Sequence, residues 1–178
     1  MFAAVWPPDG VLDHLDVALG AVRRTLPGDG TGPVRWSARE TWHLTCAFYG
    51  EVPDGLVPGL ADALAAAAAT TVPYRLRLRG AGLFSHRTLW VGVAGDTAAQ
   101  QALVRAAVDA GTAVGARPDD RPRERAHLTV GRVRNPTGGR AERFGRGRGA
   151  APGRRGSVRP PASPDGAVVV DADALVGV

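Results

Sequence analysis

Two stretches decide the fold: TWHLTCAFYG at residues 41–50 and RAHLTVGRVR at residues 125–134. Each contains the tripeptide His-Leu-Thr at the start of an apolar run, although the chain has only four histidines. Side chains alternate between the two faces of a strand, so the histidine and threonine of each tripeptide project to the same face. We therefore expect two matching strands, each with an imidazole and a hydroxyl on one face and apolar residues on the other.

Two imidazoles that face one substrate suit cleavage or transfer at a phosphodiester without a metal. The ordinary imidazole pKa is about 6.5, so one histidine can take a proton from water while the other, charged, donates to the departing oxygen. The pattern predicts His43 and His127 as catalytic residues. The hydroxyls of Thr45 and Thr129 can donate to the non-bridging phosphate oxygens.

A single strand histidine is usually structural, but the recurrence of the whole tripeptide makes chance the less favoured explanation. His14 and His86 have no matching partner and are interpreted as structural, one on a helix and one in a turn. Cys46 faces away from His43 in a regular strand, so we expect a core thiol and not a nucleophile. No ligand lies at zinc-like spacing to His43 or His127, so no metal and no cofactor are expected.

Composition indicates one domain in a reducing compartment. The 178 residues include one cysteine, which cannot form an intrachain disulfide and favours a cytoplasmic location. The start, MFAAVWPPDG, lacks the basic segment of a signal peptide, and no apolar window reaches the roughly 20 residues of a membrane span, so no membrane partner is expected. The net charge is +5 and all basic residues are arginine, but many fall between Arg132 and Arg159, which weakens the case for a basic binding face.

Hydrophobic spacing predicts alternating strands and helices up to about residue 135. Asp9 is the expected N-cap of the first helix, and Asp96 or Thr97 that of the last. Strands are predicted at 2–6, 34–36, 42–49, 74–83, 88–93 and 126–133, and helices at 9–26, 60–69 and 97–114.

The composition changes beyond Asn135, which divides the chain into a domain at 1–135 and a Gly, Arg and Pro-rich segment at 136–178. Between residues 137 and 166 only Phe144 and Val158 are large and apolar. We expect this stretch to be disordered or loosely attached, because it buries too little surface to offset the entropy of ordering. The run at 168–170 could still add an edge strand.

Two H-x-T-x motifs about half a domain apart resemble the 2H phosphoesterase superfamily, and within it the bacterial RNA 2′,3′-cyclic phosphodiesterases, also described as 2′-5′ RNA ligases. Other stretches are similar to that subfamily: FAAVWPPDGV near the start, Arg35-Trp36 before the first motif, AFYGEV after it, and HLTVGR ending at Arg132. The resemblance covers residues 1 to about 135.

This resemblance implies an α+β, bilobal, LigT-like fold in which two antiparallel sheets, flanked by helices, form a central cleft with pseudo-twofold symmetry. It implies metal-independent hydrolysis of 2′,3′-cyclic phosphate ends to 2′-phosphates, with His43 and His127 as acid and base. It also implies that Thr45, Thr129 and Arg132 bind the substrate. The expected partners are RNA with cyclic phosphate ends or small cyclic nucleotides, bound by a monomer.

The sequence departs from the subfamily in several places. Ala126 stands where proline is common, and Tyr49 where leucine is usual. Arg132 lies at odd spacing from His127, so only a bulge or a strand end would bring it to the phosphate. The carboxyl end lacks the family's further strands, which leaves open a non-catalytic RNA or nucleotide binder. A 2′-5′ phosphodiesterase or ligase of the same superfamily is a further alternative.

Overall fold

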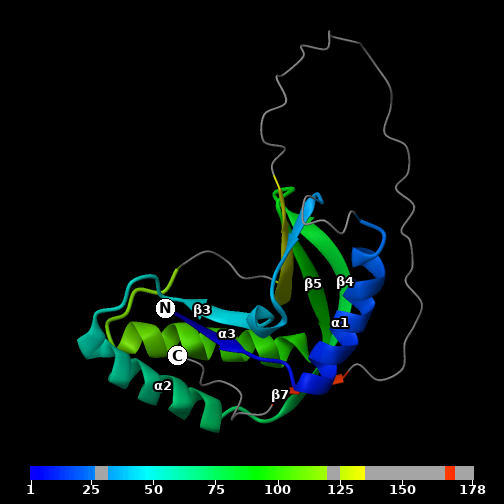
Figure 1. Cartoon of the computed structure of the whole chain (residues 1–178). Helices are drawn as coiled ribbons and strands as arrows, with labels where there is room; N and C mark the ends of the chain where they lie inside the picture. The colour runs from blue at the N-terminus through cyan, green and yellow to red at the C-terminus, as the bar shows by residue number, and fades with distance from the viewer. Residues whose placement is uncertain (27–31, 120–124, 135–166, 171–178) are drawn as a thin grey trace, which may run out of the picture.

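A computed structural model describes residues 1–26, 32–119 and 125–134, together with the backbone of 167–170 (Figure 1). The α+β class predicted from the sequence is confirmed, and no predicted boundary is more than three residues from the observed one. Among the described helices, none has the length and apolar character needed to cross a membrane. The strands are β1 (Phe2–Val5), β2 (Val34–Trp36), β3 (Leu44–Phe48), β4 (Tyr74–Phe84), β5 (Thr88–Gly95), β6 (His127–Val133) and β7 (Ala167–Val170), and the α-helices are α1 (Asp9–Arg23), α2 (Val57–Ala69) and α3 (Thr97–Ala113).

The strands of the described chain form one connected antiparallel sheet in the order β1-β3-β6-β5-β4-β7, with β2 also paired to β6. Two separate sheets were expected, and the difference arises in β6. This strand pairs with β3 at Leu128 and with β2 from Gly131 to Val133. The two halves of the sheet are therefore joined where Leu44 of β3 meets Leu128.

A register shift in β6 changes which face its last residues occupy. Leu89 and Trp90 are neighbours in β5, yet they pair with Gly131 and Thr129, so β6 holds one extra residue between these partners. Such a β-bulge reverses the simple alternation of side chains beyond it. Arg132 consequently lies on the same face as Thr129, which regular alternation would not allow.

Two predicted helix caps differ in detail from the structure. Asp9 is the first residue of α1 and not its N-cap, because Pro8 (φ −57°, ψ 151°) supplies the last extended residue. Asp96 does precede α3, but its side chain caps no helix N–H. Its Oδ2 accepts a hydrogen bond from the backbone N–H of Arg75 at 3.0 Å, which ties the start of β4 to α3.

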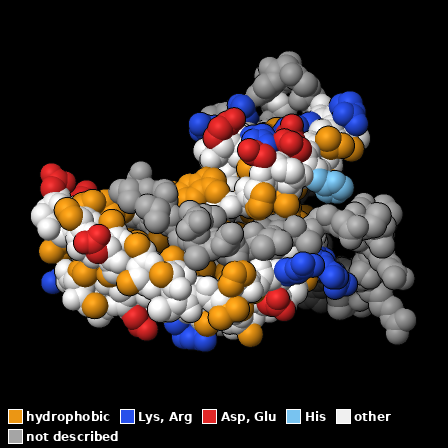
Figure 2. All heavy atoms as spheres, turned by 90° about the horizontal axis from the view of Figure 1, so that it is seen from below, with side chains coloured by type: hydrophobic (Ala, Val, Ile, Leu, Met, Phe, Trp, Pro, Cys, Tyr) orange, Lys and Arg blue, Asp and Glu red, His pale blue; other side chains and the backbone are white. Residues whose placement is uncertain are grey.

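The helices pack against different halves of the sheet. Figure 1 shows α3 running below β3 with α2 beyond it, while α1 lies beside β4 and β5. The Arg23 guanidinium of α1 lies 5.2 Å from the centre of the Trp36 ring, which places α1 against the face of β2 that carries this tryptophan. In Figure 2, hydrophobic side chains are spread over the lower part of the view among isolated charged ones, whereas acidic and basic side chains gather together in the upper part. Scattered apolar side chains of this kind are ordinary on a soluble surface.

Tyr49, one of the departures from the family pattern, is accommodated by a glycine on α3. Its hydroxyl donates to the Ala107 carbonyl at 2.7 Å, and the side chain is buried. A Cβ at Gly111 would lie 2.3 Å from Cε1 of Tyr49. Any residue other than glycine at position 111 would therefore clash with the tyrosine ring.

The edge strand expected at 168–170 is confirmed as β7, which pairs antiparallel with β4 from Tyr74 to Arg77. The rest of the segment at 136–178 lies outside the described residues, so its expected disorder stays a prediction.

Replacement of Leu128 by alanine should lower the free energy of unfolding by about 2–5 kcal/mol, because a fully buried leucine at the junction would leave a cavity. Urea denaturation measures this change. Val17→Ala is the control, since Val17 is 76% exposed and its loss should alter stability by no more than about 0.5 kcal/mol. Equal effects of the two substitutions would contradict the central place of Leu128.

Candidate active site

The two His-Leu-Thr tripeptides meet at their central residues. Leu44 and Leu128 are Cα partners in an antiparallel pair, and both side chains are fully buried. Residues directly opposite in such a pair share a face, and the flanking residues project to the other face. The four polar side chains of the tripeptides therefore lie on one face, opposite the two leucines.

Extending this register one residue each way places His43 opposite Thr129 and Thr45 opposite His127. Each imidazole thus has a hydroxyl across the strand pair as well as one in its own tripeptide. The structure brings together all four residues that the repeated motif predicts. This arrangement also has the pseudo-twofold character that the family resemblance implies.

Aromatic rings from the amino terminus pack around His43. Its ring stacks on Phe2 at 4.9 Å between centroids and lies 5.2 Å from Trp6. Nδ1 of His43 is buried and has no hydrogen-bond partner of normal geometry among the described residues. The Thr41 carbonyl nevertheless lies near enough to favour the charged form of this imidazole. Burial lowers the pKa of His43, the Thr41 carbonyl partly offsets this, and positive charge on His127 lowers it further.

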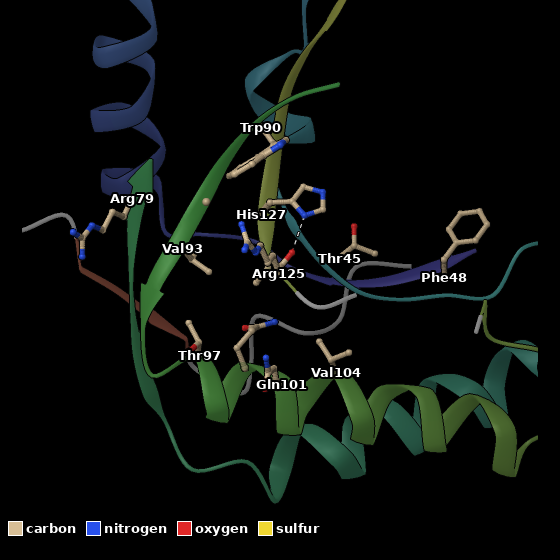
Figure 3. Close-up of a pocket in the computed structure, with 13 residues that line it drawn as sticks. Thr45, Phe48, Arg79, Trp90, Val93, Thr97, Gln101, Val104, Arg125 and His127 are labelled. Carbon is tan, nitrogen blue, oxygen red and sulfur yellow. Dashed lines mark hydrogen bonds between the residues drawn. The ribbon is translucent and has the colours of Figure 1, made fainter. Parts of the chain in front are cut away.

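His127 is held differently, by a hydrogen bond at the start of β6. Its Nδ1–H donates to the Arg125 carbonyl at 2.9 Å (Figure 3). A carbonyl can only accept, so this bond places a proton on Nδ1 and leaves Nε2 for another group. Phe84 makes an edge contact with the imidazole at 4.7 Å, and Trp90 lies 6.4 Å away.

Gly82 in β4 and Gly92 in β5 leave room for the Trp90 ring beside His127. A Cβ at Gly82 would lie 2.6 Å from the indole, and one at Gly92 would lie 3.0 Å from it. Phe84 stacks on the same indole at 5.1 Å. Sequence reasoning missed these rings, as it missed Phe2 and Trp6. Phe2, Trp6 and Trp90 lie within predicted strands and Phe84 directly after one, but this placement does not say which histidine each ring reaches.

A cavity of about 590 Å³ opens beside His127 and Thr45, within the size range of small-molecule sites. In Figure 3, Thr97, Gln101 and Val104 rise from α3 toward it. Phe48, Trp90, Arg79 and Arg125 are among the other lining residues. His43 and Thr129 share the sheet face but do not line this cavity.

The thiol of Cys46 is fully buried, as expected for a core residue. Gln100 of α3 donates from Nε2 to its Sγ at 3.7 Å and accepts from the Tyr74 hydroxyl at 2.6 Å. Burial raises the pKa of Tyr74, so this hydroxyl keeps its proton. These contacts tie β3 and β4 to α3 beneath the cavity.

Arg132 lies on the face of the four tripeptide residues because of the β6 bulge, opposite Thr88 on one side and Arg35 on the other. It does not line the cavity described above. Within residues 1–26, 32–119 and 125–134, no group of three His, Cys, Asp or Glu side chains could hold a metal ion.

The fold and the paired motifs resemble those of phosphoesterases, and comparison with known proteins finds the same likeness. The family model described as LigT like Phosphoesterase matches residues 5–90, which include the first tripeptide. The structure resembles Escherichia coli LigT with a TM-score of 0.64 and 18% identity, covering 95% of this chain and 81% of LigT. It also resembles TT0787 of Thermus thermophilus, with a TM-score of 0.60 and 27% identity, over 77% and 75% of the two chains.

Two curated relatives carry the same name, RNA 2′,3′-cyclic phosphodiesterase. That of Geobacillus stearothermophilus is 39% identical over 101 residues, which are 54% of this chain and 32% of the relative. That of Methanothermobacter thermautotrophicus is 29% identical over 140 residues, 76% of this chain and 71% of the relative. The match thus spans about a third of the first relative's length. The resemblance to the LigT-like phosphoesterases predicted from the paired motif is confirmed.

Replacement of His127 by glutamine should raise the pKa of His43. It removes the positive charge on His127, which is one of the causes that lower this pKa. The pKa should stay below about 6.5, since burial is the larger cause and remains. NMR titration of the imidazole signals measures the pKa of His43 in the wild type and in His127→Gln. The His43 signal is assigned by its absence from the spectrum of His43→Gln. The matched control is His14→Gln on α1, which should leave the pKa of His43 unchanged. An unshifted pKa in the His127 variant would contradict the proximity of the two rings.

Proposed function

We propose that this protein is a phosphodiesterase that opens 2′,3′-cyclic phosphates at RNA ends to 2′-phosphates, without a metal. The observation that carries the proposal is the opposed pairing of the two tripeptides about Leu44 and Leu128. The names of the two curated relatives support the substrate class. The structure of Escherichia coli LigT complexed with 3′-AMP, which has the same fold, supports a nucleotide ligand.

The reaction needs one proton taken and one proton given. One imidazole, in its neutral form, removes a proton from a water molecule as the water oxygen attacks phosphorus. The other imidazole, in its charged form, donates a proton to the 3′ oxygen as the bond from phosphorus to that oxygen breaks. The phosphate stays on the 2′ oxygen, and the two histidines recover their starting states by exchange with solvent.

The remaining residues of the site act on the phosphate's charge. Thr45 and Thr129 lie on the same face as the histidines, so their hydroxyls can donate to the non-bridging oxygens as negative charge builds there. Arg132 lies on this face because of the bulge, and its guanidinium offsets the same charge. His127 presents Nε2 to the substrate because its Nδ1–H is engaged by the Arg125 carbonyl.

Hydrolysis of 2′,3′-cyclic nucleotides and of a short RNA with a cyclic phosphate end should proceed in EDTA and yield a 2′-phosphate. His43→Ala and His127→Ala should each lose at least about 10²-fold in kcat, since each removes a general acid or base. The pH profile of the wild-type kcat/KM should be bell-shaped. His14→Ala is the matched control and should retain full activity, because His14 is exposed on α1.

Other outcomes would contradict the proposal in different ways. A folded wild type that binds RNA but turns nothing over would favour a non-catalytic binder. Activity restored only by an added divalent metal would overturn the metal-independent mechanism. Preference for a 2′-5′ linkage over the cyclic phosphate would move the protein to a sibling activity of the same superfamily.

A further inference from the structure

We infer that Arg35 binds a phosphate upstream of the reacting one, so that the preferred substrate is an RNA strand and not a cyclic mononucleotide; this inference rests on the proposed function. Arg35 lies in β2, outside both tripeptides and outside the cavity. Arg35 and Arg132 form an arginine pair on the face of the sheet that carries the two histidines.

Register places the arginine pair on that face. Arg35 is the Cα partner of Arg132, and Arg132 is the partner of Thr88. Thr88 and Trp90 are two residues apart in β5 and so project to one face, and Trp90 is the partner of Thr129. The sheet therefore presents one continuous face from Thr129 to Arg35.

The opposite face of β2 is occupied by α1. Trp36 follows Arg35 in the strand and so projects the other way, where it meets the guanidinium of Arg23 at 5.2 Å. The side chain of Arg35 thus lies on the face away from α1, and it is exposed.

Charge makes this pair an anion site. Directly opposed like charges on neighbouring strands destabilise a sheet, and neither arginine has a carboxylate partner in the described part of the chain. Elsewhere the chain does pair its arginines, as Arg23 with Asp16 at 2.7 Å. Strands β2, β4, β5 and β6 contain no Asp or Glu. A phosphate near the two guanidinium groups would relieve the repulsion and accept charge-assisted hydrogen bonds.

The spacing of the two arginines suits them to different phosphates. Arg132 and Thr129 lie opposite Thr88 and Trp90, which are two residues apart in β5. A strand rise of about 3.3 Å per residue therefore separates Arg132 from Thr129 by about 7 Å along the sheet, within reach of a long side chain from the reacting phosphate. Arg35 lies one strand further, by about 4.8 Å. A cyclic mononucleotide has one phosphate and would leave Arg35 without an anion, whereas an RNA strand supplies another.

An exposed aromatic ring on the same face favours a single-stranded nucleic acid. Phe84 is the partner of Thr88, is 38% exposed and stacks on Trp90. Arginines that contact the backbone, combined with aromatic rings on which bases stack, are typical of proteins that bind single strands. The arginine pair and Phe84 meet this description next to His127.

The test compares kcat/KM for a 2′,3′-cyclic mononucleotide and for a short RNA ending in a cyclic phosphate. Arg35→Ala should lower the value for the RNA roughly tenfold and leave the mononucleotide within about twofold, because only the RNA loses a charge-assisted contact. The slope of log kcat/KM for the RNA against log salt concentration should become less negative by about one, because one phosphate contact is lost. Arg24→Ala is the matched control, since it removes the same charge from an exposed position next to α1, on the covered side of the sheet.

Equal losses on both substrates, or no loss on the RNA, would overturn the inference. Thermal unfolding of the variants shows whether folding is intact, and Arg35→Gln replaces the alanine variant if it is not. If the wild type hydrolyses neither substrate, the proposed function fails, and binding then decides the inference separately. In that case the Kd of a fluorescently labelled RNA must weaken roughly tenfold in Arg35→Ala and stay unchanged in Arg24→Ala, and an unchanged Kd in both would overturn it.

Discussion

The antiparallel contact of Leu44 with Leu128 is the constraint on which the site depends. It joins the two halves of the sheet, and it fixes the face on which each histidine lies. A slip of one residue in this register would carry an imidazole into the core and a leucine into the site. The full burial of both leucines opposes such a slip, because exposing either one would lose its hydrophobic stabilisation. Packing of the core and geometry of the site are thus set by one interaction.

The tripeptides match in sequence, but their surroundings do not. His127 is oriented by a hydrogen bond to a backbone carbonyl, whereas His43 packs against aromatic rings and its buried Nδ1 has no partner of normal hydrogen-bond geometry within the described part of the chain. The lowered pKa of His43 reflects this difference and the nearby charge of His127. In the proposed reaction, the acid and the base need different protonation states at the same pH. Unequal environments for equal side chains favour such a difference.

Sequence reasoning succeeded where local periodicity carries the information. The parity of His43 with Thr45, the succession of helices and strands, and the edge strand at 168–170 follow from local patterns: alternation, helical spacing and a run of β-branched residues. Sequence reasoning failed where the position of a side chain depends on the pairing or packing of two segments that are distant in the sequence. The bulge that turns Arg132 toward the site arises from the pairing of β6 with β5, and the contact of Phe2 with His43 joins residues that no local pattern links. The cap expected at Asp9 was wrong because Pro8 had already supplied the extended residue.

The site opens in two directions from the paired tripeptides. On one side lies the cavity bounded by α3, which is about 590 Å³ in volume, and on the other the sheet face leading to Arg35. An RNA strand bound as proposed would extend from its reacting 3′ end in one direction only, so its terminal nucleoside and the rest of the strand would contact different parts of the site. A bounded cavity suits a single nucleoside, while an exposed face with arginines and an aromatic ring suits a chain of any length.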